Sequence, residues 1–230
     1  MDITQLEWGP DVNSYHPVKD WHALATSGST FFAAKATEGA HTVDQTFQRH
    51  RDGVRAFGAT FATVVYYHFF HAEKSPEDQA NLITDTVGAL AANERLCCDF
   101  EGRSYLDADS KWRVDPAVMR SHGLDMLERF YATLEAHGML ANRGLIYTSA
   151  QHWRAIGNPA WSRATDLDLW VPRYHLPDPE APDVLPAPWP TWSVLQYTDG
   201  NQGIHRDVPG VGLCDVNVVA PIGAPLDPQT

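Results

Sequence analysis

The sequence predicts a single α/β domain, a closed barrel of eight strands in which only the first five strands are followed by helices. Up to about residue 156, short apolar runs alternate with amphipathic stretches, as in successive strand–helix units of a parallel sheet. Three further apolar runs follow without convincing helices between them. Acidic and aromatic residues stand at or near the ends of the runs, where barrel strands present a functional site.

Each of the first five predicted strands is rich in apolar residues and leads into a predicted helix. The strands cover residues 8–13, 31–36, 61–70, 96–101 and 144–148. The helices cover residues 18–26, 45–57, 75–92, 115–137 and 151–156. Pro76 and Pro116 stand at first helical positions, where proline is well tolerated, and Gly58 and Gly138 suit helix ends.

The polar stretch at residues 103–115 separates the fourth strand from its helix. It is longer than the usual connection of about 2 to 6 residues in such units. Long loops beside a candidate site are more often functional than decorative, so this loop is a candidate for a functional role that the sequence does not specify.

The last three strands are predicted at residues 168–174, 191–197 and 212–217. The link between the first two of them is rich in proline, which excludes a helix there. The order of elements therefore predicts a (β/α)5(β)3 architecture, a modified TIM-like barrel with about five helices, over residues 1–220. Residues 221–230 form a predicted proline-rich tail.

The composition excludes several classes of partner. With 17 basic and 29 acidic residues the net charge is -12, and no basic stripe appears, so we expect no nucleic-acid partner. No run of 18 apolar residues occurs, so we expect no insertion into a membrane. The first residues have neither the basic nor the apolar region of a signal peptide. The chain is expected to be a monomer.

Neither a metal nor another cofactor is expected. Cys97, Cys98 and Cys214 show no Cys-x-x-Cys spacing, and buried free thiols are favoured over a disulfide. His68 and His71 are three residues apart, which places them on opposite faces of a strand. The chain contains no His-Glu-x-x-His, no Gly-x-Ser-x-Gly elbow and no complete dinucleotide loop.

The most informative feature is the pair Asp99 and Glu101, which ends the fourth predicted strand. Alternate side chains of a strand share a face, so the two residues should point the same way with Cα atoms about 6.5 to 7 Å apart. Two close carboxyls in a partly dry site do not both ionise easily, which raises the pKa of one of them. This arrangement suits acid/base hydrolysis, although two solvated acids at a strand end would show the same motif.

Similar residues stand at the ends of the other predicted strands. Aromatic faces stack on sugar rings and carboxylates bind sugar hydroxyls, so a ring of such residues indicates a carbohydrate site. The residues at or near strand ends are Asp11, Glu38, Tyr67, Asp99, Glu101, Tyr147, Tyr174, Gln196 and Asp215.

The order and spacing of several motifs resemble glycoside hydrolase family 25, the lysozymes or N-acetylmuramidases of bacteria, fungi and phages. The resemblance covers roughly residues 7 to 220. It rests on Gly9-Pro10-Asp11-Val12-Asn13-Ser14-Tyr15, Lys35-Ala36-Thr37-Glu38-Gly39, Tyr67-His68-Phe69, Asp99-Phe100-Glu101, Ile146-Tyr147-Thr148, Leu169-Trp170-Val171, Gln196-Tyr197 and Asp215-Val216-Asn217. It implies a flattened barrel of eight strands and five helices that hydrolyses the β-1,4 bond between N-acetylmuramic acid and N-acetylglucosamine in peptidoglycan.

The resemblance also implies roles for individual residues. Glu101 would be the general acid and Asp99 the residue that orients or stabilises the substrate N-acetyl group. Asp11 and Asp215 would flank the cleft, and Tyr67 would place its hydroxyl near the reacting centre. The residues expected to bind substrate are Glu38, Tyr147, Trp170, Tyr174 and Gln196.

Some positions depart from the family pattern without removing a carboxylate. Pro10 replaces an aliphatic residue, Leu195 replaces a frequent tryptophan, Cys97-Cys98 stand where aliphatic residues are normal, and Val65-Tyr66 replace Gly-Ala. The resemblance implies action on cell wall outside the producing cytoplasm, with glycan strands of peptidoglycan as the partner.

Two other functions remain open. A chitinase-like barrel also uses Asp-x-Glu on a strand, but its full motif would place an aspartate where Cys97 stands. An inactive barrel that only binds muropeptides would not need the whole set of four carboxylates. For an active enzyme, two carboxyls on one strand approach the sugar from the same side, which favours the substrate acetamido oxygen as nucleophile and net retention. Inversion with Asp11 or Asp215 as base stays open.

Overall fold

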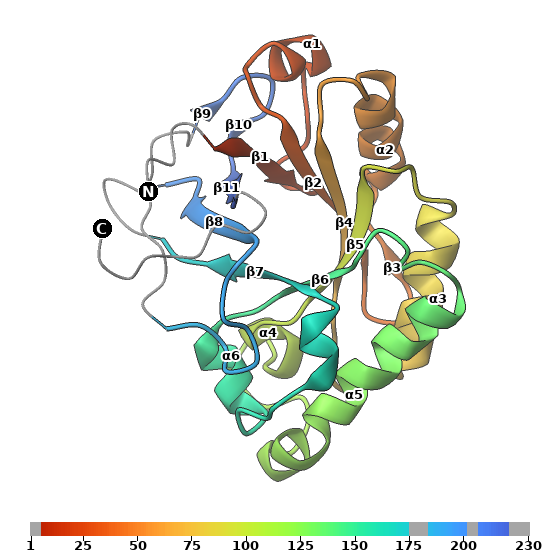
Figure 1. Ribbon diagram of the computed structural model, residues 1–230, viewed down its shortest axis with the longest axis vertical. Coiled ribbons are helices and arrows are strands. Elements are labelled where there is room, and N and C mark those ends of the chain that lie inside the picture. The colour runs from red at the N-terminus through yellow and green to blue at the C-terminus, as the bar shows by residue number, and fades with distance from the viewer. Residues whose placement is uncertain (1–5, 175–183, 202–206, 221–230) are drawn as a thin grey trace.

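The chain folds into a closed barrel, seen in the computed structural model in Figure 1, which describes residues 6–174, 184–201 and 207–220. The predicted tail at residues 221–230 lies outside these ranges. The barrel strands are β1 (Glu7–Val12), β2 (Phe31–Glu38), β4 (Thr63–Phe69), β5 (Glu94–Asp99), β6 (Leu145–Tyr147), β7 (Asp168–Pro172), β8 (Val194–Asp199) and β11 (Asp215–Val219). A two-residue strand, β3 (Thr42–Val43), pairs with β2, and β9 (Asp207–Val208) pairs with β10 (Gly212–Leu213).

The predicted fold class is confirmed, with one correction to the direction of the last strand. From β1 through β2, β4, β5, β6 and β7 to β8, each barrel strand is parallel to its neighbour. Strand β11 closes the barrel between β8 and β1 and is antiparallel to both. Asp215 therefore lies at the amino end of its strand, not at the carboxyl end. Because the strand is reversed, its amino end reaches the same rim as the carboxyl ends of the others.

Helical segments follow the first five barrel strands, as predicted. They are α1 (Trp21–Ala25), α2 (Phe47–Ala56), α3 (Pro76–Val87), α4 (Gly102–Tyr105), α5 (Pro116–Ala136), α6 (Ala150–Ala155) and a 3₁₀ turn at Ser162–Thr165. Ser75 and Asp115 cap α3 and α5 by accepting backbone N–H bonds, and a proline follows each cap. Helix α3 ends five residues before the predicted end because Gly88 adopts a positive φ of 64°.

The long loop after β5 contains more structure than expected. Its first residues form the short helix α4, and Leu106 and Trp112 then make an isolated antiparallel bridge. Within this turn Tyr105 stacks on Trp112, with ring centroids 5.1 Å apart. The loop is therefore a folded arm beside the carboxyl end of β5.

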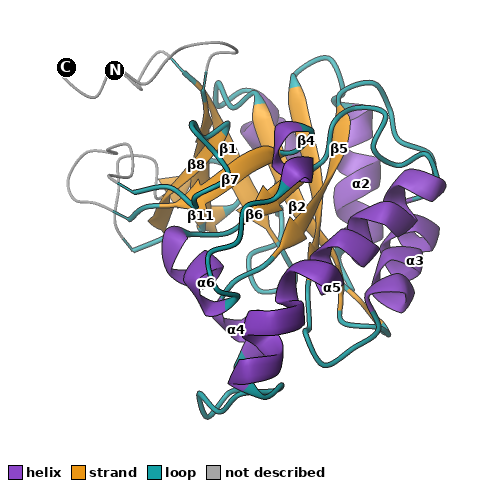
Figure 2. Ribbon diagram, turned by 60° about the horizontal axis from the view of Figure 1, so that its bottom comes forward, coloured by secondary structure: helices purple, strands orange, loops and turns teal. Residues whose placement is uncertain are grey.

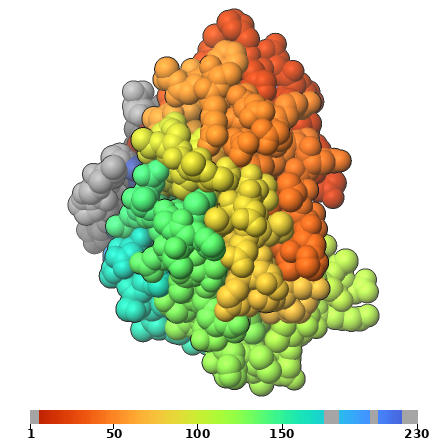
Figure 3. Space-filling view, turned by 90° about the vertical axis from the view of Figure 1, so that its right-hand side faces the viewer, coloured from red at the N-terminus to blue at the C-terminus, as the bar shows by residue number. Residues whose placement is uncertain are grey.

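The helices are unevenly distributed around the barrel. Helices α2, α3 and α5 pack along the side made by β2, β4 and β5, and β8 and β11 lie away from them (Figure 2). The three helices lie next to one another across the surface shown in Figure 3, coloured orange, yellow and green. The larger apolar core fills the space between these helices and the outer face of the strands.

A second apolar cluster fills the interior of the barrel, and the alternation of side chains along the strands explains it. Phe31 and Ala33 of β2, Val65 of β4, Cys97 of β5 and Leu145 of β6 are all buried in this cluster. Two residues further along each strand the next inward side chain reaches the rim. The barrel floor is thus apolar and its rim is polar.

The described residues include three buried free cysteines, in agreement with the expectation from the sequence. Among the same residues there is no helix long and apolar enough to cross a membrane. In the described ranges, no group of three or more His, Cys, Asp or Glu side chains is arranged so that it could hold a metal ion.

Gly9 of β1 is required where the barrel closes. A Cβ atom at this position would lie 1.7 Å from the backbone oxygen of Phe31, so two strands would have to separate. We expect Gly9→Ala to lower the free energy of unfolding by about 3 kcal/mol or more, measured by urea denaturation. Gly28→Ala is the control, because Gly28 has a positive φ of 88° but open space around it. That substitution should cost only about 1 kcal/mol of backbone strain. Equal losses in the two variants would contradict the close-approach argument.

Candidate active site

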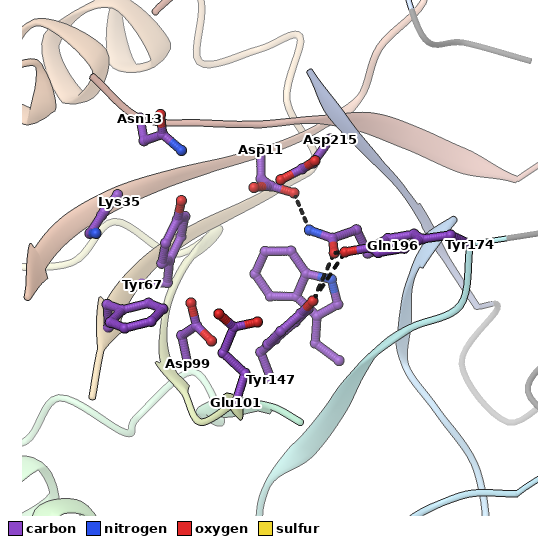
Figure 4. Close-up of a pocket in the computed structure, with 12 residues that line it drawn as sticks. Asp11, Asn13, Lys35, Tyr67, Asp99, Glu101, Tyr147, Tyr174, Gln196 and Asp215 are labelled. Carbon is purple, nitrogen blue, oxygen red and sulfur yellow. Dashed lines mark hydrogen bonds between the residues drawn. The ribbon is translucent and has the colours of Figure 1, made fainter. Parts of the chain in front are cut away.

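The polar rim of the barrel surrounds a cavity of about 200 Å³ (Figure 4). Nine of the ten residues predicted for the site line it, and they come from seven barrel strands and the segments that follow two of them. These residues are Asp11, Tyr67, Asp99, Glu101, Tyr147, Trp170, Tyr174, Gln196 and Asp215.

Asp99 and Glu101 point into the same cavity, as their spacing predicts. Strand β5 ends at Asp99, but Glu101 keeps an extended conformation with φ -132° and ψ -169°. The intervening Phe100 is buried in the outer core. Ser104 of α4 fixes this backbone, because its Oγ accepts a bond from the Glu101 N–H at 3.1 Å and donates to the Asp99 carbonyl at 3.2 Å. The first turn of α4 thus holds both carboxyls at the rim.

The Asp99 carboxyl sits in an environment that disfavours its charge. Burial, and then repulsion from Glu101, raises its pKa well above the usual range, against the attraction of Lys35. Its Oδ1 atom is buried and has no hydrogen-bond partner among the described residues. An acceptor left unpaired in this way is available to a donor on a bound molecule.

Glu101 and Asp215 share this tendency to hold a proton. Burial raises the pKa of Glu101, and the nearby Arg103 and Lys35 counteract part of the effect. Burial and the Asp11 and Asp199 carboxyls raise the pKa of Asp215 to about 8. The cavity therefore contains carboxylic acids that can transfer a proton near neutral pH.

Asp11 is held by two amide side chains from the end of the barrel sequence. Its Oδ2 accepts bonds from Gln196 Nε2 and Asn217 Nδ2, both at 2.9 Å. These bonds favour the charged form, although burial still gives a net rise in the pKa of Asp11. Asn217 in turn accepts from the Trp170 indole N–H at 2.8 Å. Strands β1, β7, β8 and β11 are thus joined directly beneath the cavity.

Aromatic side chains form the opposite wall. Tyr147 donates to Gln196 Oε1 at 2.8 Å, and the Tyr174 hydroxyl donates to the same oxygen. The ring of Trp170 packs edge-on against Tyr147 and Tyr67, with centroids 5.4 and 6.2 Å apart. Burial raises the pKa of Tyr67 well above its usual range, which keeps its hydroxyl a neutral donor. The cavity can therefore offer ring faces and hydroxyl groups to a sugar.

Glu38 is the one predicted residue that does not line the cavity. It forms ion pairs with Lys35 and with His71 Nε2, the latter at 3.1 Å, and the interaction with His71 lowers the Glu38 pKa to about 2. Lys35 itself faces the cavity, so Glu38 contacts the site only through Lys35. Glu38 therefore lies behind the cavity wall.

Three lining residues were not predicted: Asn13, Lys35 and Phe69. All three belong to motifs on which the family resemblance rests. Lys35 lies two residues after the interior residue Ala33 of β2, and Phe69 lies two residues after the rim residue Tyr67 of β4. Because alternate side chains of a strand share a face, this spacing could have identified both residues. The Lys35 ammonium also lies over the Phe69 ring, 4.9 Å from its centroid.

A barrel of mostly parallel strands with carboxyl groups and aromatic side chains gathered at one rim is typical of sugar-cleaving hydrolases. The comparison with family models gives the particular family. The chain belongs to glycosyl hydrolases family 25, whose model matches residues 10–205. The resemblance inferred from the motifs is thereby confirmed.

Individual relatives agree with this assignment. An autolytic lysozyme of Clostridium acetobutylicum is 25% identical over 174 residues, which cover 74% of this chain and 46% of that protein. The chain thus spans about half the length of this curated relative. The bacterial lysozyme from Streptomyces coelicolor superimposes with a TM-score of 0.76 at 24% identity, over 95% of this chain and 94% of its own. A muramidase from Acremonium alcalophilum gives a TM-score of 0.74 at 24% identity, over 94% and 95%. These two likenesses establish the fold.

The raised pKa of Asp215 predicts a pH-dependent cost in stability. The folded chain holds this proton up to about pH 8, whereas an unfolded aspartate releases it near 3.8. Stability is therefore present in full below pH 3.8 and is lost as the pH rises toward 8. Asp215→Asn removes this loss, so the variant should exceed the wild type in free energy of unfolding by about 1 to 2 kcal/mol at pH 8.

Urea denaturation at pH 4 and pH 8 measures this difference. The gap between variant and wild type should be small at pH 4 and grow with pH. Asp166→Asn serves as control, because this exposed aspartate lies in the turn before β7 and lines neither cavity. A variant no more stable than the wild type at pH 8 would refute the electrostatic argument.

Proposed function

We propose that the chain is a muramidase that hydrolyses the β-1,4 bond between N-acetylmuramic acid and N-acetylglucosamine in peptidoglycan. The observation that carries the proposal is the convergence of Asp11, Asp99, Glu101 and Asp215 on one cavity in a family 25 chain. Lysozymes and muramidases among the relatives make the same substrate the first candidate. The enzyme would act as a monomer on glycan strands of cell wall, outside the cytoplasm of the producing cell.

Glu101 is the proposed general acid. It must carry a proton at the pH of the reaction and lie where the leaving oxygen can reach it. Its raised pKa meets the first condition, and its position at the cavity wall beside Tyr147 fits the second. Loss of the proton to the glycosidic oxygen would assist departure of the N-acetylglucosamine unit.

The proposed nucleophile is the acetamido oxygen of the muramic acid unit. Asp99 lies beside Glu101 on the same chain segment, so it is poorly placed to attack from the opposite face of the sugar. The unpaired Oδ1 atom of Asp99 can instead accept the acetamido N–H. This bond would stabilise the Asp99 anion and align the acetamido oxygen with the anomeric carbon. Tyr67, neutral and close to Asp99, would donate to the same group.

The remaining two acids would support the reaction from the other side of the cavity. Asp11 is fixed by Gln196 and Asn217, and its neighbour Asp215 is protonated up to about pH 8. Together they would orient the water that opens the cyclic intermediate, after which Glu101 recovers its proton from that water. The reaction would then proceed with net retention.

Substitution of Glu101 tests the acid. Glu101→Gln keeps the shape of the side chain but cannot transfer a proton. Turnover of purified peptidoglycan, measured as release of reducing ends, should fall by about 10² to 10⁴-fold. The melting temperature should not fall, because the substitution removes a buried acid and leaves the Ser104 contacts to the backbone intact. Near-normal turnover at an unchanged melting temperature would exclude Glu101 as the acid.

The stereochemistry of the product tests the nucleophile. Participation of the acetamido group requires that the β-anomer appear first in NMR spectra recorded during early turnover. It also requires the N-acetyl group on the cleaved unit, so de-N-acetylated muramic substrates should be nearly inert. Early appearance of the α-anomer would demonstrate inversion and would leave Asp11 or Asp215 as candidate bases.

A further inference from the structure

A second cavity, of about 420 Å³, adjoins the first. Its walls come from the start of α6 and from the segment that ends β7, and include Ser149, His152, Arg154, Val171, Arg173 and Tyr174. Tyr174 also lines the first cavity, so the two hollows share one wall. A molecule bound in the first cavity could therefore extend past Tyr174 into the second.

The charge of the second cavity is opposite to that of the first. Its described lining contains Arg154 and Arg173 and no carboxylate, in a chain of net charge -12. Arg154 is exposed, and its guanidinium makes no hydrogen bond or ion pair to the described residues. Most other arginines of the described chain are held in bonds, such as Arg55 to Glu94 and Arg163 to Glu128. A solvated guanidinium at a cavity wall is available to a ligand carboxylate.

The other described residues that line the second cavity carry no charge at neutral pH. A hydrogen bond of 3.0 Å joins His152 Nδ1 to the Tyr105 hydroxyl. Burial lowers the pKa of His152 to about 4. At neutral pH its ring thus adds no charge. Val171 is buried and half-buried Pro172 adjoins it, which gives the cavity an apolar floor. Positive groups at the wall and an apolar floor suit an acidic peptide better than a bare sugar.

We propose that the second cavity binds the acidic peptide attached to the muramic acid unit, with Arg154 and Arg173 contacting its carboxylates. The inference rests on the proposed function. In peptidoglycan this peptide is joined to the sugar through a lactyl ether, so it leaves the ring close to the bond that is cut. Passage over the shared Tyr174 wall places its carboxylates beside the two guanidinium groups. The enzyme would then recognise the peptide as well as the glycan.

Soluble glycan oligomers that carry stem peptides test the proposal in two forms. One form has free peptide carboxylates, and in the other they are converted to amides. Wild type should show kcat/KM about threefold to tenfold higher on the free form, mainly through KM, as expected for a partly solvated ion pair. Arg154→Ala should lose this preference and leave activity on the amide form unchanged. Arg154→Lys should keep much of it, because the charge remains.

Arg120→Ala is the matched control, since Arg120 is an exposed arginine of α5 that lines neither cavity. It should retain the full preference for free carboxylates. The effects of Arg154→Ala and of amidation should be non-additive, because each removes the same contact.

Additive effects, or an equal loss by Arg154→Ala on both oligomers, would overturn the proposal. If no bond is cleaved, the preference for free carboxylates is measured instead from the dissociation constants of the two oligomers, determined by calorimetry. Absence of cleavage would then refute the proposed function, and equal dissociation constants would refute the peptide site.

Discussion

The structure depends on holding four carboxyl groups close together in a partly buried cavity. Repulsion between them and the loss of hydration both oppose their charge, and the raised pKa values of Asp99, Glu101 and Asp215 express that cost. The barrel compensates with fixed donors and one cation. Two amides hold Asp11, and Lys35 lies among the acids with its own partner, Glu38, behind the wall. Such a cluster forms only where several strands end at one rim.

Much of this arrangement follows from the sequence because it is governed by local periodicity. The period of two along each strand puts an apolar side chain on the floor and a polar one at the rim, as in Leu145 followed by Tyr147. The same period brings Asp99 and Glu101 to one side, although Glu101 has left the strand. Asp115 as cap with proline after it made the start of α5 predictable, and Gly138, which has a positive φ of 71°, made its end predictable.

What the sequence could not supply depends on partners distant in the chain. Glu38, for which the sequence predicts substrate binding, does not line the cavity, and its oxygens pair with His71 and Lys35. The reversed direction of β11 is set by pairing with β1 and β8, and the described part of the connection that leads to it contains only the two short strands β9 and β10. The second cavity joins α6 to the end of β7, and no local pattern indicates that the two segments share a wall.

The closure of the barrel by its first and last strands has a consequence for biosynthesis. Asp11 receives its hydrogen bonds from residues 185 and 206 positions later in the chain. A ribosome-bound chain can form the early strand–helix units, but it lacks this closure until its final strand emerges. The completed acid cluster thus appears only after β11 has left the ribosome. Products truncated before β8 would therefore carry Asp99 and Glu101 without Gln196 and Asp215, which complete the site.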